Sequence, residues 1–396
     1  MEAVELVARL YDTYPFPPDP VLETPPPGYN WRWSWPGAYG FCTRGIYPKK
    51  NKIRILDAGC GSGVSTEYLA HLNPEAEIWA IDISAGTLAV AQERINKTVP
   101  STRQIHLQQL SIFDLDQIEG KFDFINSVGV LHHTSDPAKA LQCLASKLNE
   151  GGLLHIFVYA EIGRWEIRLM QAAIALLRKG AGIAAGDFQQ GVALGRAIFK
   201  ALPKENRLVI REQSRWAMDN QRDECFADMY LHPLEVNFNI DSLFAMIDQS
   251  DLQFVGFSNP EVWQLERLLG SDPQLMHYTQ KLSAQEQYRL IELLDTDIAH
   301  YEFFLTKPPL PQLSPSSEVL LDSVPVRHPC IQGWESRSLF DLNYRVVELS
   351  ELEFAFMRQC NDNLCVKEIL AQNPAFELKL ITQLLDKHMI LLQVRE

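Results

Sequence analysis

Short apolar runs and amphipathic stretches alternate along most of this chain. The apolar runs have the length of strands, and the stretches between them repeat apolar residues at helical spacing. Strands are predicted at 53–58, 77–83, 103–108, 122–128, 153–159, 252–257 and 301–306, and helices at 64–72, 84–95, 136–148, 241–249 and 284–298. The alternation predicts an α/β fold with a largely parallel sheet and helices on both of its faces.

The first predicted strand ends in a glycine-rich turn. Gly59, Gly61 and Gly63 follow Asp57 at alternate positions, and an amphipathic run starts at Val64. Glycine lets a ligand approach the main chain closely, and the N-terminus of the next helix directs free N–H groups and a positive dipole end at that ligand. The turn therefore predicts a site for an anionic or polar ligand.

A dinucleotide-binding turn has a similar composition but a different spacing. That fingerprint needs glycine or alanine three positions after Gly61, where this chain has Val64. Asp82 ends the second predicted strand, where an acidic side chain can accept hydrogen bonds from ribose hydroxyls. A dinucleotide and any other ligand that contains a nucleoside would both use that acid, so Asp82 does not discriminate between them.

The run from Leu56 to Gly63, LDAGCGSG, resembles the first motif of the class I S-adenosylmethionine-dependent methyltransferases. The likeness extends over roughly residues 52–307. It implies a Rossmann-like, seven-stranded sheet whose last strand is antiparallel, with S-adenosylmethionine as the cofactor. It also implies that Asp57 and the backbone near Gly59 and Gly61 hold the methionine part, while Asp82 holds the ribose. An ammonium suits a carboxylate, and a carboxylate suits N–H groups, so the chemistry fits.

The resemblance also implies an adenine site after the third strand. In that family an acid accepts a hydrogen bond from the adenine amino group, and apolar neighbours enclose the ring. The corresponding residues are Ile83, Ile112, Phe113 and Asp114. Asp114 could instead be a turn residue, and Asp116 beside it leaves the register of the acid open.

Polar residues follow the fourth predicted strand. Asn126, His132 and His133 are expected at the carboxyl edge of the sheet, where ligands of open α/β sheets bind. A histidine there can be a general base, or the pair can only shape the cofactor site. Ser127 and Val128 stand where enzymes that methylate nucleic-acid bases have prolines, which argues against that substrate.

The first 50 residues form a leader rich in proline and aromatic residues. A helix is predicted at 2–14, and the prolines from Pro15 to Pro20 end it. The aromatic residues that follow, Tyr29, Trp31, Trp33 and Trp35, alternate as on an extended segment. They can pack the leader against the domain, or the leader can be a lid that places Tyr11 and Tyr14 near the transferred methyl group.

Residues 163–236 interrupt the alternation and predict a helical insertion. Apolar helices are expected at 165–178 and 188–202, as a cap over the substrate or as a dimer surface. Near its end Asp228, Tyr230 and His232 alternate, so on an extended segment they would share one face and could deprotonate an acceptor. They could equally make only local polar contacts before a proline turn.

A proline-rich linker at 308–317 precedes a short C-terminal unit, residues 318–396, that resembles a winged-helix module. Such modules bind DNA when the recognition helix is basic. In the helix predicted at 376–387, Glu377 and Asp386 offset Lys379 and Lys387. Contact with a protein or homodimerisation is therefore favoured.

The composition of the chain disfavours some classes of partner. The net charge of −14 disfavours nucleic acid, and no apolar run has the length of a membrane span. The seven cysteines form no CxxC pair, and the acidic start is unlike a secretory signal, which together predict a cytoplasmic protein without a metal site.

Three hypotheses remain for the function. The first is methyl transfer to a protein side chain, most simply to nitrogen; in size and layout the chain is loosely similar to the cyanobacterial enzymes that methylate an asparagine of phycobiliproteins. The second is methylation of a small or lipophilic metabolite. The third is a non-catalytic regulator or scaffold that binds the cofactor. The catalytic candidates are His132, His133, Tyr14, Asp228 and His232.

Overall fold

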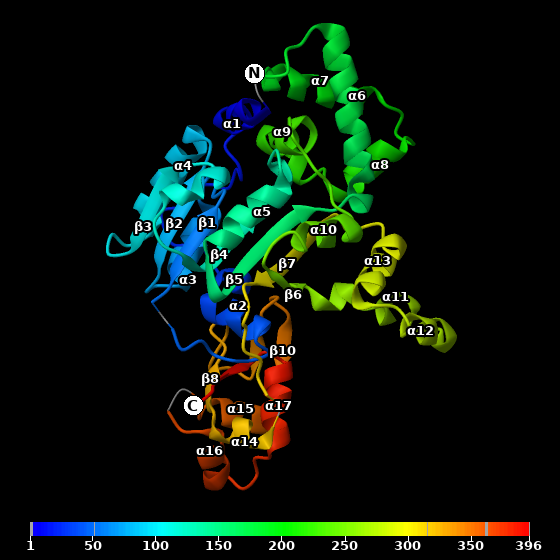
Figure 1. Ribbon diagram of the computed structural model, residues 1–396. Coiled ribbons are helices and arrows are strands. Elements are labelled where there is room, and N and C mark those ends of the chain that lie inside the picture. Colours follow the sequence, from blue (N-terminus) through cyan, green and yellow to red (C-terminus); the bar gives the residue numbers. More distant parts are fainter. Residues whose placement is uncertain (1–2, 51, 315, 361–362, 396) are drawn as a thin grey trace.

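The structure is a computed structural model that describes residues 3–50, 52–314, 316–360 and 363–395. Its centre is a seven-stranded sheet with the strand order β3-β2-β1-β4-β5-β7-β6 (Figure 1). The strands are β1 (Arg54–Ala58), β2 (Glu77–Asp82), β3 (Gln104–Gln109), β4 (Phe122–Val128), β5 (Leu148–Tyr159), β6 (Gln253–Phe257) and β7 (His300–Thr306).

Strands β1 to β5 pair in parallel, and β7 lies antiparallel between β5 and β6. Both the seven strands and the reversed direction of the last one confirm the predicted fold class. The main difference is at β5, which begins five residues before the predicted Leu153 because its first residue, Leu148, already pairs with Phe122.

Helices cover both faces of the sheet. One face packs against α2 (Trp35–Cys42), α3 (Val64–Leu72) and α4 (Ala85–Thr98), and the other against α5 (Pro137–Ser146) and α10 (Ile240–Ile247). Side chains at the start of two helices cap them: Ser84 accepts the Thr87 N–H, and Asp136 accepts the Lys139 N–H. Helices α11 (Glu266–Leu269), α12 (Pro273–Thr279) and α13 (Ala284–Leu294) lie between β6 and β7 in the chain.

The leader has two parts with different surroundings. Helix α1 (Ala3–Thr13) lies beside α4 and the helical insertion. Residues 29–47 instead pack on the face of the sheet that α2, α3 and α4 cover. The prediction of an extended aromatic segment is wrong, because Trp31–Trp33 is a turn of 3-10 helix and Trp35 begins α2. The alternative that these rings pack the leader onto the domain is what the structure describes: Trp31 contacts Phe304, and Trp35 contacts Phe124.

The insertion is a bundle of helices above the carboxyl edge of the sheet. It consists of α6 (Trp165–Ala181), α7 (Phe188–Ala201), α8 (Arg207–Arg215) and α9 (Asp223–Leu231). Helix α9 corrects the prediction of an extended segment at 228–232. His232 follows α9 as its C-cap residue, and on the helix itself Asp228 points to a different side from Tyr230. Its hydroxyl bonds to Glu212 of α8.

The C-terminal unit lies at the opposite end of the molecule from the insertion (Figure 1). It comprises α14 (Ser317–Asp322), α15 (Glu351–Met357), α16 (Val366–Gln372) and α17 (Leu378–Asp386), with β8 (Val324–Arg327) paired to β11 (Ile390–Gln393) and β9 (Ser338–Phe340) paired to β10 (Val346–Glu348). It docks on the leader, where the Leu392 N–H donates to Gly45 and Tyr344 stacks on Tyr29. Among the described residues, no helix has the length and apolarity of a membrane span.

Candidate functional site

One large cavity, of about 800 Å³, lies at the carboxyl edge of the sheet. The glycine turn, the leader and the insertion all contribute to its wall. The wall of the cavity has two parts. The glycine end is formed by Gly59, Cys60, Gly61, Asp82, Ile83, Ser111, Ile112, Phe113, Gly129 and Val130, and the aspartate end by Tyr11, His133, Tyr159, Arg164, Trp216 and Asp228.

The glycine end depends on main-chain conformations that favour glycine. Gly59 and Gly61 have φ angles of 80° and 52°, in the left-handed region. A Cβ atom on Gly61 would lie 2.3 Å from the Phe16 carbonyl oxygen, and one on Gly59 would lie 2.4 Å from Val130. The turn is therefore packed on both sides, and no larger residue fits without a shift of its neighbours.

Asp82 lies in the wall beside this turn. Its Oδ2 accepts the Gly61 N–H at 2.9 Å, and its Oδ1 accepts the Ser84 N–H at 2.9 Å. Burial raises the pKa of the Asp82 carboxyl, and these hydrogen bonds oppose that rise. The carboxylate thus joins the glycine turn to the start of α4 and still reaches the cavity, where it can accept hydrogen bonds from a ribose.

Asp57 does not occupy the place that the motif predicts for it. Only 1 % of its surface is exposed, and it is not among the residues that line the cavity. Its carboxylate accepts hydrogen bonds from Ser65 Oγ, Thr66 Oγ1 and Asn126 Nδ2, at 2.6, 2.6 and 2.8 Å. The structure therefore places Asp57 and Asn126 beneath the glycine turn, and direct contact of Asp57 with a cofactor ammonium is not what this geometry offers.

The predicted adenine residues divide between wall and surface. Ile83, Ile112 and Phe113 line the glycine end and present apolar surface to it. Asp114 is exposed and lies outside the wall; Ser111, which caps the 3-10 turn Ile112–Gln117, lies in it. Gly63 packs against Ala91 of α4 and is likewise not a lining residue.

The leader covers the glycine end. The Ser62 N–H donates to the Phe16 carbonyl, and Asp12 Oδ1 accepts from Ser84 Oγ and the Gly86 N–H. Arg94, buried in α4, donates to the carbonyls of Asp19 and Pro20 and pairs with Glu67. Contacts of residues 12–20 with the glycine turn and with α4 thus hold the leader over the turn.

The aspartate end is organised around Asp228 of α9. Tyr11 donates a hydrogen bond to its Oδ1 at 2.9 Å, and Tyr159, the last residue of β5, donates to its Oδ2 at 3.4 Å. Burial raises the pKa of Asp228, whereas the charge of His133 and the Tyr11 hydrogen bond lower it. Burial likewise raises the pKa of Tyr11 well above its usual value, so both tyrosines act as donors.

His133 lies against this carboxylate. Its Nδ1 is 2.9 Å from the Leu234 carbonyl oxygen, which can only accept, so Nδ1 carries the hydrogen and Nε2 is left as an acceptor. The ring stacks on His232, with centroids 3.5 Å apart. Burial lowers the pKa of His133, and the charge of Asp228 opposes this. In this tautomer the ring keeps the Nε2 lone pair, which can accept a hydrogen bond or a proton.

Three catalytic candidates lie outside the cavity wall. His132 is fully buried, and neither of its ring nitrogens has a hydrogen-bond partner among the described residues. Tyr14 packs against the apolar core of the insertion. His232 lies behind the wall, where its ring contacts Tyr11 and stacks on His133, and its Nδ1 accepts the Leu234 N–H.

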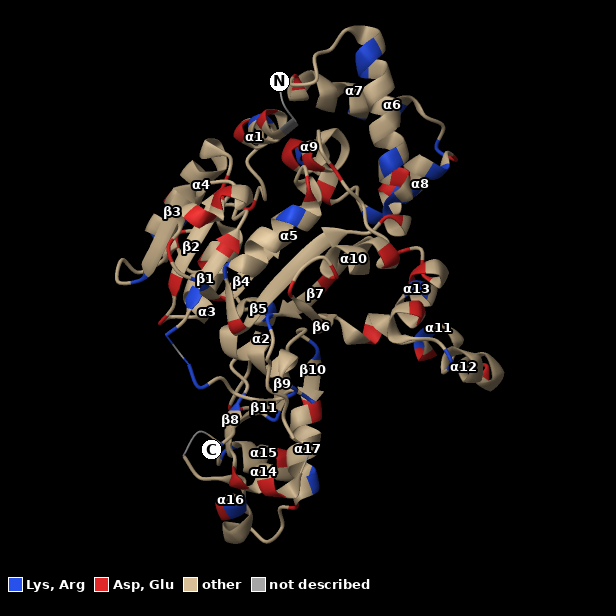
Figure 2. Cartoon of the chain, in the orientation of Figure 1, with Lys and Arg blue, Asp and Glu red and all other residues tan. Residues whose placement is uncertain are grey.

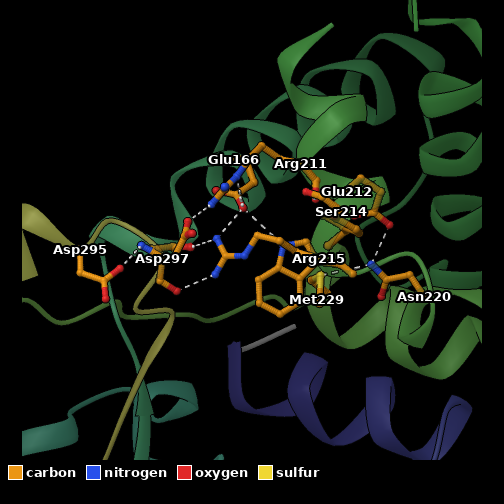
Figure 3. Close-up of polar contacts among 12 residues, drawn as sticks. Glu166, Arg211, Glu212, Ser214, Arg215, Asn220, Met229, Asp295 and Asp297 are labelled. Atoms are coloured by element: carbon orange, nitrogen blue, oxygen red, sulfur yellow. Dashed lines mark hydrogen bonds and ion pairs between the residues drawn. The ribbon is translucent and has the colours of Figure 1, made fainter. Parts of the chain in front are cut away.

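A charged cluster holds the insertion against the loop that leads into β7 (Figure 3). Glu166 of α6, 3 % exposed, accepts from Arg215 at 3.0 Å and pairs with Arg211 at 3.4 Å. Arg211 also pairs with Asp297 at 2.7 Å. In Figure 2, blue positions of α8 lie next to red acidic ones. The cluster fixes Trp216, whose ring forms part of the aspartate end.

Tyr159, Arg164 and Trp216 were not predicted as site residues. The guanidinium of Arg164 lies 3.4 Å from the centre of the Tyr159 ring and pairs with Glu235. Tyr159 could have been found, because it ends a strand at the carboxyl edge of the sheet, as Asn126 nearly does. Arg164 and Trp216 carry no such signal, because the helices that position them come together only in the folded chain.

Comparison with known proteins agrees with this geometry. A family model described as a methyltransferase domain matches residues 56–154, the region of the glycine turn and the first strands. An uncharacterized protein of Synechococcus sp., syc1184_c, is 56 % identical over 98 % of this chain and 93 % of its own length. An uncharacterized phycocyanin operon protein W of Pseudanabaena tenuis is 68 % identical over 92 residues, which are 23 % of this chain and 86 % of that protein.

Other relatives share less of the chain. The mitochondrial ubiquinone biosynthesis O-methyltransferase of Saccharomyces cerevisiae is 30 % identical over 27 % of this chain and 34 % of its own. The solved structure of PKMT2 from Rickettsia typhi, also known in complex with AdoHcy, has the same fold over 93 % of this chain and 77 % of its own, with a TM-score of 0.61 at 15 % identity. With the seven-stranded sheet and the glycine turn described above, these findings make the chain a class I S-adenosylmethionine-dependent methyltransferase, in one family with syc1184_c.

Proposed function

We propose that the enzyme methylates a nitrogen atom of a protein side chain, with Asp228 orienting that nitrogen. The observation that carries the proposal is the Asp228 carboxylate, which is held by two tyrosine hydroxyls in the same cavity as the glycine turn. A buried carboxylate next to aromatic faces suits an amine, because the positive charge of the amine offsets the negative charge of the carboxylate.

In this proposal the cofactor lies at the glycine end. Asp82 accepts from the ribose, Ile83, Ile112 and Phe113 enclose the adenine, and the backbone of Gly59 to Gly61 meets the methionine part. The residues fit such a group, because Cβ atoms at both glycines would collide with their neighbours and Asp82 retains access to the cavity. The bound cofactor supplies the electrophilic methyl group.

The aspartate end then has two tasks. Asp228 accepts an N–H of the acceptor and turns the nitrogen lone pair toward the methyl group, and Nε2 of His133 takes up the proton that nitrogen loses. Holding the nitrogen near attack distance contributes most of the acceleration, roughly 7–11 kcal/mol. Helix α1 acts as a lid, and the insertion acts as the cap over the acceptor.

Exposed apolar side chains at the rim support a protein as the acceptor. Met218 and Val4 line the cavity and yet are 81 % and 43 % exposed. One belongs to the insertion and the other to α1, so both could contact a protein that covers the cavity. A small metabolite would use the interior of the cavity and would leave both side chains in water.

A second candidate is a lipophilic metabolite. The ubiquinone biosynthesis relatives favour it, as does the apolar surface that Val7, Leu110 and Phe157 add to the wall. Those relatives match about a third of their own length, so their substrate carries over less directly than their cofactor region.

Transfer of labelled methyl groups distinguishes these two. The purified enzyme is incubated with methyl-labelled cofactor and a cell lysate, which is then separated into protein and small-molecule fractions. Phycocyanin is the first defined acceptor to add, because of the phycocyanin operon relative. We expect label in protein, recovered after complete proteolytic digestion as an N-methyl amino acid, and about a hundredfold less of it with Asp228→Asn. Label confined to small molecules would replace this proposal by the second.

A further inference from the structure

A row of buried polar side chains crosses the sheet beneath the glycine turn. Asp57 of β1 is the register partner of Asn126 in β4, which in turn is the partner of His155 in β5. Register partners point to the same face, here the one that the leader tryptophans cover. Glu302 of β7 continues the row and pairs with Arg32 of the leader at 2.8 Å. His155 has no exposed surface and does not line the cavity.

The hydrogen bonds fix the direction of every group in the row. Asn126 Nδ2 donates to Asp57 at 2.8 Å, so the other end of that amide, Oδ1, faces His155 Nδ1 at 2.9 Å and needs a donor. His155 Nε2 lies 3.2 Å from Oε1 of Glu302, which is also an acceptor. A histidine that donates from both nitrogens is an imidazolium.

The charges along the row support this protonation state. Arg32, Glu302, His155 and Asp57 alternate in sign, so each buried charge has an opposite one next to it or one amide away. A neutral His155 would leave one buried carboxylate uncompensated, which is costly.

The far end of the row holds the first turn of α3. Asp57 accepts from Ser65 and Thr66, while Gly63 at the N-cap of this helix offers no side-chain cap. The carboxylate therefore ties α3 to β1 across the glycine turn, and Ser65 itself lines the cavity. The position of Asp57 thus sets the shape of the turn that receives the cofactor.

We infer that His155, as an imidazolium between Glu302 and Asn126, is a positioning residue of the cofactor site: it fixes the Asn126 amide, and through it the Asp57 carboxylate under the glycine turn. It touches neither cofactor nor acceptor. The inference rests on the methyltransferase activity and is independent of the acceptor's identity.

The first test measures the protonation state in the wild-type protein. In a two-bond ¹H–¹⁵N correlation spectrum of ¹⁵N-histidine-labelled protein at pH 7.5, we expect both ring nitrogens of His155 at the shift of protonated imidazolium. The spectrum of His155→Gln assigns the signal, with Glu302→Gln as a second route. A lone-pair nitrogen on His155 would overturn the inference even if the variants fold poorly.

The second test separates positioning from general stability. His155→Gln removes the charge, and His328→Gln is the control, since His328 is equally buried but lies in the C-terminal unit, where its Nδ1 accepts the Cys330 N–H. We expect His155→Gln to weaken binding of S-adenosylhomocysteine about tenfold, with kcat at saturating cofactor within about twofold. His328→Gln should leave the affinity unchanged. Equal affinities in both variants, or a loss in kcat alone, would contradict the inference.

Discussion

The glycine end and the aspartate end of the cavity are built in opposite ways. The glycine end is formed by the turns that follow β1, β2, β3 and β4, so its residues appear in the order of the strands, between residues 59 and 130. The aspartate end brings together Tyr11, His133, Tyr159 and Asp228 from four distant segments. The glycine end therefore follows from the order of the strands, whereas the aspartate end depends on tertiary packing. Substitutions should therefore separate cofactor affinity from methyl transfer, and the predictions below test that separation.

The largest effect is expected at Asp228. Asp228→Asn keeps the shape of the side chain but removes its charge and half of its acceptors, so kcat should fall by about a hundredfold or more. The affinity for S-adenosylhomocysteine, measured by calorimetric titration, should stay within about twofold. Asp219→Asn, at the exposed rim of the same cavity, is the control. A comparable loss of affinity in Asp228→Asn would mean that the two ends are not separable.

Gly61→Ala tests the other end. The new Cβ would collide with the Phe16 carbonyl, so the turn or the leader has to move, and cofactor affinity should fall about tenfold. Gly182→Ala, outside the cavity wall, shares the left-handed φ and meets nothing within 4 Å, so it isolates the backbone strain. If both variants bind the cofactor equally well, the contact between leader and turn is unimportant for binding.

Tyr11→Phe should have a smaller effect, about fivefold on kcat, because one hydrogen bond to Asp228 is lost. It should also change the pH profile. The Tyr11 hydrogen bond lowers the pKa of Asp228, and transfer needs the ionised carboxylate, so removing it should move the acidic limb of kcat to higher pH. Tyr14→Phe should match the wild type throughout, because Tyr14 packs into the insertion.

The smallest effect is expected at His132. His132→Phe replaces a ring whose two nitrogens are buried without partners, so activity and cofactor affinity should stay within about twofold. The melting temperature, followed by circular dichroism, should be unchanged or higher, since the buried unsatisfied nitrogens are removed. A large loss of activity would restore His132 as a catalytic residue and place part of the acceptor chemistry outside the cavity wall.

Sequence patterns predicted the sheet well because its central strands are largely buried and the strands are separated by helices of regular spacing. β4 was placed to the residue, and the direction of β7 followed from the resemblance. Patterns failed where a short aromatic segment could be extended or helical: Trp31 to Trp35 and Asp228 to His232 alternate in sequence, yet both segments are helical or turn-like.

The residues of the site were predicted unevenly for a related reason. A motif specifies which residues lie near a turn, but not which of them face the ligand. The resemblance assigns both Asp57, within the glycine motif, and Asp82, at the end of the next strand, to the cofactor. Only Asp82 reaches the cavity, because Asp57 accepts hydrogen bonds from the hydroxyls of Ser65 and Thr66 in the first turn of α3. Tyr159 and Trp216 depend on how β5 and the insertion pack, which no local pattern records.

The leader has a kinetic consequence. Asp12 fastens it beside Asp82, Phe16 fastens it to the glycine turn, and Tyr11 fastens it to Asp228, so one segment spans both ends of the cavity. A movement of this segment therefore changes both ends of the cavity together. In the proposed arrangement, release of the spent cofactor from the glycine end and the order around Asp228 are coupled through the leader.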